Sequence, residues 1–108
     1  MNNKPIKKAL GRAVKPTIMP DLTKRFTSIQ LAKAIMAKRT AMKLSLIDVS
    51  KALSISKPTL IKIEKGQTNV SFANILKVLE LLGLSFTIIS DDINHYNDFT
   101  GKTDDPWY

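Results

Sequence analysis

The chain has 108 residues, of which 44% are hydrophobic, so it can fill one hydrophobic core but not two. Its 17 lysines and arginines against nine aspartates and glutamates give a formal charge of +8, which favours a polyanionic partner. The absence of cysteine excludes disulfide scaffolds, thiol nucleophiles and thiolate metal sites.

Charge divides the chain into three segments. Residues 1–27 hold seven basic groups and one acid, residues 28–90 nine and three, and residues 91–108 one and five, which gives +6, +6 and −4. Because prolines interrupt the first segment, we expect residues 1–26 to be a flexible basic arm, followed by a folded domain at 27–90 and an acidic tail at 91–108. No apolar stretch is long enough to span a membrane and no signal peptide is evident, so we expect a cytoplasmic protein.

Two helices are predicted first, each after a hydroxyl residue that can cap it. Thr27 with Gln30 predicts a capping box and a helix over 28–42. Its inward face consists of Leu31, Ile35, Arg39 and Met42. Ser45 with Asp48 repeats the capping box before a helix over 46–53, whose inward face consists of Val49, Ser50 and Leu53.

Two more helices follow. Ser56 caps the third, in which Pro58 is tolerated because the first turn needs no N–H from it, and Gly66 ends it. Ser71 caps the fourth, which ends at Gly83. Its apolar stripe consists of Phe72, Ile75, Leu76, Leu79 and Leu82.

After Gly83 the hydrophobic period changes from helical to alternating. Residues 84–89 alternate apolar and hydroxyl side chains, which predicts a strand. The favoured partner is the same strand of a second subunit, and the alternative is the N-terminal arm. The residues expected at the dimer strand are Leu84, Phe86, Thr87 and Ile88.

The second and third helices have the lengths of a helix-turn-helix, in which the second of the pair enters the DNA major groove. On the third helix Thr59, Leu60 and Ile63 share one arc. The opposite arc holds the expected base-contacting residues Lys57, Pro58, Ile61 and Lys62. Lysine can donate to guanine and Ile61 can contact a thymine methyl, whereas the alternative interpretation is a solvated face with one stray isoleucine.

The run from Ser45 to Gly66 resembles the core of the Xre/Cro-type helix-turn-helix repressors. Its most specific part is Ser56-x-x-Thr59-Leu60-x-x-Ile63-Glu64-x-Gly66. The flanks at 30–34, 74–79 and 84–87 are similar to those of HipB-type antitoxins, and the resemblance covers roughly residues 27–90. Leu46 departs from the usual Gln of this family, and Ser50 and Ser54 depart from the usual Ala and Gly.

The resemblance implies a lambda-repressor-like bundle of helices, all-α except for one short C-terminal strand that pairs across a homodimer. It also implies that the third helix reads an inverted-repeat operator and that Arg39 forms an ion pair with Glu64. In such modules the antitoxin regulates its own operon and binds a HipA-like serine/threonine kinase toxin, or an accessory subunit. A C-terminal tryptophan lies near the kinase in this family, so Trp107 and Tyr108 are the expected partner-binding residues.

We further assign phosphate contacts to residues around the third helix. These residues are Ser45, Ser56, Thr59, Lys65, Gln67 and Thr68. His95 is the only histidine and lies in the acidic tail, so we expect no catalytic site, metal or cofactor.

The sequence therefore predicts a bacterial DNA-binding repressor that is the antitoxin or regulator of a HipA-type toxin-antitoxin operon. The alternative is an interaction module that inhibits a partner protein through its tails, with DNA binding secondary.

Overall fold

Each helix in residues 14–90 begins directly after a hydroxyl residue whose side-chain oxygen accepts a hydrogen bond from the backbone N–H three positions later. The computed structural model describes residues 14–90. Within them the helices are α2 (Ser28–Ala41), α3 (Leu46–Leu53), α4 (Lys57–Glu64) and α5 (Phe72–Leu82), capped by Thr27, Ser45, Ser56 and Ser71. The predicted all-α helix-turn-helix bundle is confirmed.

Of the two predicted capping boxes, the one at α3 is present in full and the one at α2 only in half. Around α3 the box is complete, because Asp48 N–H donates to Ser45 Oγ at 3.0 Å and Ser45 N–H donates to the Asp48 carboxylate at 2.8 Å. For α2 the prediction is wrong in one half, since Thr27 caps Gln30 but the Gln30 side chain turns away from Thr27. It donates instead to the carbonyl oxygens of Asp21 and Lys24, both at 3.0 Å, and so holds the preceding loop.

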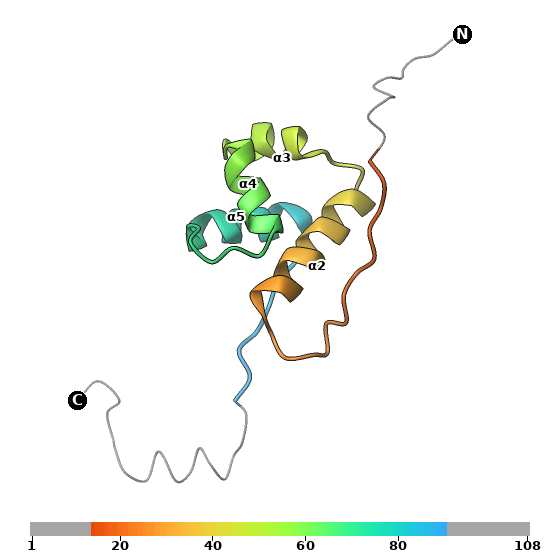
Figure 1. The fold of residues 1–108 in the computed structure, drawn as a ribbon, viewed down its shortest axis with the longest axis vertical. Coiled ribbons are helices and arrows are strands. Elements are labelled where there is room, and N and C mark those ends of the chain that lie inside the picture. The colour runs from red at the N-terminus through yellow and green to blue at the C-terminus, as the bar shows by residue number, and fades with distance from the viewer. Residues whose placement is uncertain (1–13, 91–108) are drawn as a thin grey trace, which may run out of the picture.

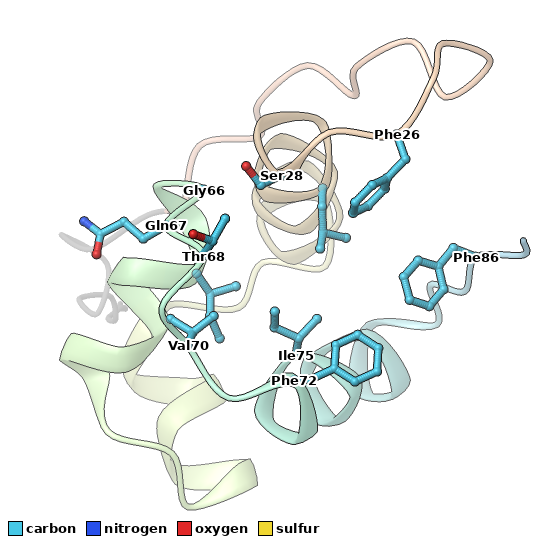
Figure 2. Close-up of a pocket in the computed structure, with 11 residues that line it drawn as sticks. Phe26, Ser28, Gly66, Gln67, Thr68, Val70, Phe72, Ile75 and Phe86 are labelled. Carbon is cyan, nitrogen blue, oxygen red and sulfur yellow. The ribbon is translucent and has the colours of Figure 1, made fainter. Parts of the chain in front are cut away.

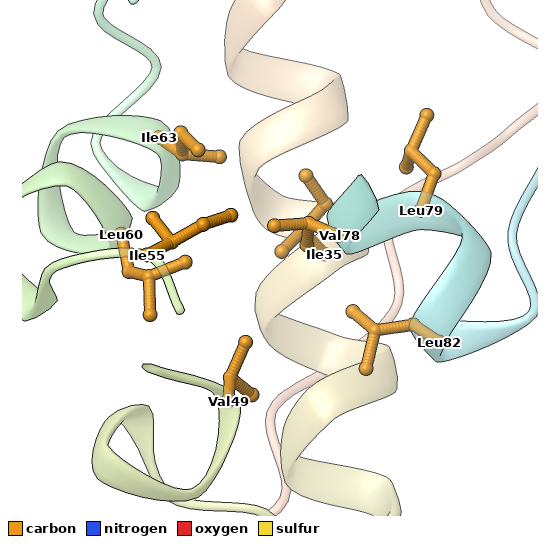
Figure 3. Packing of buried hydrophobic residues seen from close by; sticks show 8 residues of the cluster. All are labelled: Ile35, Val49, Ile55, Leu60, Ile63, Val78, Leu79 and Leu82. Carbon is orange, nitrogen blue, oxygen red and sulfur yellow. The ribbon is translucent and has the colours of Figure 1, made fainter. Parts of the chain in front are cut away.

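The core lies where all four helices meet (Figure 3). Helix α2 contacts α4 and α5, and α3 contacts the same two helices from its own side (Figure 1). The buried cluster consists of Ile35, Val49, Ile55, Leu60, Ile63, Val78, Leu79 and Leu82. Because α2 lies against two neighbours, small residues such as Ala34 and Ala37 are buried along with Ile35.

The predicted stripe of α5 is partly wrong. Leu79 and Leu82 are buried as expected, but Phe72 and Leu76 are 59% and 44% exposed, while Val78, absent from the prediction, is 1% exposed. The face of α5 that meets the core is therefore rotated toward Val78.

The turn between α3 and α4 requires an unusual backbone conformation. Ser54 has φ +56°, and the N–H of Ile55 donates to the carbonyl of Ser50 at 3.3 Å. This left-handed residue reverses the chain so that Ile55 enters the core at 5% exposure. Glycine adopts such a conformation without the steric cost that serine carries, and glycine is the usual residue at this position in the repressors that the sequence resembles.

Residues 14–26 form neither helix nor strand and run beside α2 in the reverse direction (Figure 1). Thr17 N–H donates to Thr40 Oγ1 at 3.0 Å near the end of α2, and Gln30 holds the loop near its start. Within that loop the hydroxyl and the N–H of Thr23 donate to the Asp21 carboxylate, and these bonds lower the pKa of Asp21. No pattern in the sequence of residues 14–26 indicates these contacts.

Residues 84–90 follow α5 without helix or strand pairing among the described residues. Leu84 packs against the core and its N–H donates to the carbonyl of Leu79 at 2.9 Å. A strand acquires its ladder bonds from a neighbouring strand, so the strand at 84–89 and the dimer formed through it stay predictions. The arm residues 1–13 and the tail, with His95, Trp107 and Tyr108, lie outside the described residues.

Candidate nucleic-acid interface

The outer face of α4 is open to solvent because its inner face is anchored in the core. Leu60 and Ile63 are 3% and 4% exposed, so the rotation of the helix about its axis is fixed. Lys57, Pro58 and Lys62 are exposed and Ile61 is half-buried. The four residues predicted to contact bases therefore share one accessible face that carries both cations and apolar groups.

An ion pair fixes the C-terminal end of α4. Arg39 Nε donates to Glu64 Oε2 at 2.6 Å and Arg39 Nη2 donates to Glu64 Oε1 at 2.9 Å, which is the bidentate geometry of strong arginine–carboxylate pairs. The same guanidinium donates from Nη1 to the carbonyl of Leu44 at 2.8 Å. One side chain thus ties α4 to α2 and to the turn before α3.

Three hydroxyl residues predicted to contact phosphate take part in helix capping. Ser45 and Ser56 are N-caps, and Thr59 is hydrogen-bonded to Ser56. Ser45 Oγ accepts from Asp48 N–H, and Ser56 Oγ accepts from Thr59 N–H. Ser56 Oγ and Thr59 Oγ1 also share a hydrogen bond of 2.9 Å. A capping hydroxyl acts as an acceptor, so the Ser45 proton and one proton of the Ser56–Thr59 pair remain available to a phosphate oxygen.

The loop after α4 presents the other predicted phosphate contacts. Gly66, with φ +78°, ends the helix, and the N–H groups of Gly66 and Gln67 donate to the carbonyls of Ile63 and Lys62. A side chain at residue 66 would meet Ile29, because its Cβ would lie 2.6 Å from Ile29 Cδ1. This close turn leaves Lys65, Gln67 and Thr68 exposed.

Leu46 stands where the repressors that the sequence resembles usually have glutamine. Leu46 is the first residue of α3, and its half-buried side chain packs against the core. Its side chain offers no polar group, so the groups at the start of α3 that could bind a phosphate are the Ser45 hydroxyl and the backbone N–H groups of the first turn.

The described part of the chain is strongly basic. It contains twelve lysines and arginines and four aspartates and glutamates, a charge of +8. The carboxylate nearest in sequence to Lys62 and Lys65 is that of Glu64, which is held by Arg39. The field at the outer face of α4 is therefore set by cations.

Neither a metal cluster nor a membrane-spanning helix is found in residues 14–90. No group of three histidine, cysteine, aspartate or glutamate side chains lies close enough there to hold a metal ion. No helix in this range combines the length and hydropathy needed to cross a membrane.

Comparison with known proteins gives one family and two solved structures. The model of the helix-turn-helix family HTH_3 matches residues 35–89. A HipB–O4 20mer complex is 25% identical, with a TM-score of 0.57 over 64% of this chain and 97% of the other. A complex of a HipB variant with an O2 20mer is 24% identical, with a TM-score of 0.58 over 67% and 100%. No curated protein matches the chain.

Proposed function

Because the chain belongs to the Xre-type helix-turn-helix family, we propose that it is a sequence-specific transcriptional repressor that places α4 in the DNA major groove. The observation that carries the proposal is the outer face of α4. It combines lysines that can donate to guanine with apolar groups that can contact a thymine methyl, on a helix whose orientation is fixed by the core and by Arg39.

Phosphate contacts at both ends of α4 orient the helix in the groove. Ser56 and Thr59 lie at its N-terminal end, whereas Lys65, Gln67 and Thr68 follow its C-terminal end. Ser45 adds a contact from the start of α3. Such contacts set register and orientation, while the side chains between them read the bases.

The protein acts as a homodimer paired through residues 84–89 and binds an inverted repeat whose half-sites lie one DNA turn apart. It is the antitoxin or regulator of a HipA-type module, and Trp107 and Tyr108 bind the kinase or an accessory subunit. Support for this assignment comes from the similarity to a HipB–O4 20mer complex and from the HipB-like sequence flanks.

The test is binding to the DNA directly upstream of the protein's own gene, measured by fluorescence anisotropy against a scrambled duplex of equal length. We expect a large preference for the upstream fragment and protection of an inverted repeat in a footprint. Lys33→Ala serves as a control, because it removes one positive charge at an exposed position of α2 outside the helix-turn-helix. This variant should retain the preference for the upstream fragment. Equal affinity for both duplexes would refute a sequence-specific repressor and favour the interaction module.

A further inference from the structure

An open cavity of about 300 Å³ lies where α2 begins, α4 ends and α5 begins (Figure 2). Leu31, Ile63, Val70 and Ile75 contribute aliphatic walls. Three phenylalanines from three separate parts of the chain complete it, namely Phe26 before α2, Phe72 on α5 and Phe86 after α5.

The three phenylalanines remain about half exposed, although Phe26 and Phe72 both contact Phe86. The ring centroids of Phe26 and Phe86 lie 6.1 Å apart in an edge-on arrangement, and those of Phe72 and Phe86 lie 6.4 Å apart in a stacked one. Their exposed fractions are 55%, 59% and 48% for Phe26, Phe72 and Phe86. Apolar surface gathered around a cavity in this way is typical of a binding site, and aromatic walls at these spacings favour an aromatic ligand.

The chain itself supplies a segment with the right chemistry and reach. The described residues end at Ser90, four positions after Phe86, and the following segment contains Trp107 and Tyr108. Trp107 lies seventeen positions after Ser90, and a random coil of that length spans about 20–25 Å on average, which is enough to reach a cavity beside its starting point. Residues 91–108 carry a charge of −4, whereas the described residues carry +8.

We propose that residues 91–108 fold back onto their own domain and place Trp107 in this cavity, between Phe26, Phe72 and Phe86. Size permits it, because a cavity of about 150 Å³ lined by similar side chains holds a benzene molecule, and this one has about twice that volume. Attachment to the same chain raises the local concentration of the indole to the order of 1 mM, so even a weak contact is substantially occupied.

Docking of Trp107 would place acidic residues beside the loop after α4, to which the proposed function assigns phosphate contacts. Gln67 and Thr68 line the cavity and are also proposed phosphate contacts, and this consequence rests on the proposed function. Asp104 and Asp105 stand three and two positions before Trp107. Their carboxylates near Lys65 would oppose the approach of phosphate, so the docked tail and DNA exclude each other.

The size of this inhibition follows from the fraction of molecules whose cavity is empty. For an indole that dissociates from the cavity with a constant of about 0.1–1 mM, the empty fraction is about one tenth to one half at the local concentration given above. The apparent dissociation constant for DNA then rises by about two- to tenfold.

The first experiment uses Trp107 as a probe, since it is the only tryptophan of the chain. In the wild-type protein we expect the fluorescence of Trp107 to be blue-shifted and protected from quenching by acrylamide. Phe72→Ser should return both properties to those of an indole in water. Leu76→Ser is the matched control one turn further along α5, because Leu76 is 44% exposed but does not line the cavity, and it should leave the fluorescence unchanged.

Three outcomes would overturn the docking proposal. They are a water-like emission of Trp107 in the wild-type protein, an equal effect of Phe72→Ser and Leu76→Ser, and a blue shift that disappears on dilution. The last would mean that Trp107 is buried between two copies. Far-UV circular dichroism checks that each variant keeps its helices.

The second experiment measures DNA affinity of the wild-type protein and Trp107→Ala at low salt, on a duplex of mixed sequence and on the upstream fragment. We expect the variant to bind both about two- to tenfold more tightly. Equal affinities alongside a protected Trp107 would overturn the competition with DNA. If neither protein binds DNA while Trp107 is protected, the docked tail stands and the proposed function fails.

Discussion

Arg39 and Glu64, which are 25 residues apart in the sequence, meet through two hydrogen bonds of 2.6 and 2.9 Å between α2 and the last residue of α4. Their side chains are 11% and 8% exposed, so removing either partner leaves a poorly solvated charge. We expect Arg39→Met or Glu64→Met to lower the free energy of unfolding by about 3 kcal/mol. The double variant should cost much less than the sum, and urea denaturation of all four proteins gives the coupling energy. Strictly additive costs would show that the two groups do not interact.

Ser54→Gly should stabilise the protein. Ser54 is an exposed residue with φ +56°, and glycine removes the steric cost of that conformation without losing packing. The expected gain in the free energy of unfolding is about 0.5–1 kcal/mol, measured by urea or thermal denaturation. Ser54→Ala is the control, because alanine keeps the Cβ and should bring no gain. A loss of stability with glycine would contradict the strain assigned to this turn.

Lys57→Ala and Ile61→Ala should relax the choice of operator sequence. Both side chains lie on the accessible face of α4, where each good base contact contributes about 1–3 kcal/mol of discrimination. The measurement is the ratio of affinities for the upstream fragment and for single base-pair variants of it. If both variants keep the wild-type ratios, the assignment of the groove face is wrong.

Lys65→Ala should act differently from the α4 variants. Lys65 is exposed directly after the helix, next to the loop assigned to phosphate. Its removal should weaken binding to all duplexes alike and reduce the slope of log affinity against log salt by about one. Titrations at four or more salt concentrations measure that slope. An unchanged slope would place Lys65 away from the DNA backbone.

Thr87→Pro should dissociate the proposed dimer. Proline removes one backbone N–H from the strand expected at 84–89, whereas Thr87→Ala keeps it and serves as the control. Phe86 is a poor site for this test, because its ring already contacts Phe26 and Phe72 within one chain. Sedimentation at micromolar concentration should show a wild-type dimer and a monomeric proline variant. A monomeric wild type would refute the dimer.

Local signals predicted the helices well. Four hydroxyl caps and the glycines after α4 and α5 act within a few residues of the chain, so α3 was predicted at its observed bounds. Which arc of a helix is buried depends on its neighbours, and this is where the prediction for α5 failed. Phe72 and Leu76 lie at one edge of the apolar stripe, whereas Val78 lies toward the other edge, which faces the core.

The family resemblance implied the contact between Arg39 and Glu64, but the other contacts between distant segments carried no signal in the sequence. Nothing in the periodicity of residues 14–26 indicates that Thr17 bonds to Thr40, because each of the two residues is ordinary in its own segment. The phenylalanine cavity was missed for the same reason, since its three rings come from three segments. The accessible face of α4, in contrast, could be predicted, because it follows from the helical period and from the burial of Leu60 and Ile63 on the opposite side.

The hydrogen bond from Thr17 to Thr40 also determines where the basic arm is attached. Had the arm been held only at Thr27, its root would lie at the start of α2. Because residues 14–26 run back along that helix, the root lies about 20 Å away, near the end of α2 and the turn into α3. The sequence before residue 14, which contains the cations Lys4, Lys7, Lys8 and Arg12, therefore joins the described part of the chain on the side where α3 begins. Deleting the residues before 14 removes these charges and leaves the Thr17–Thr40 hydrogen bond in place. Deleting the residues before 27 removes that hydrogen bond as well.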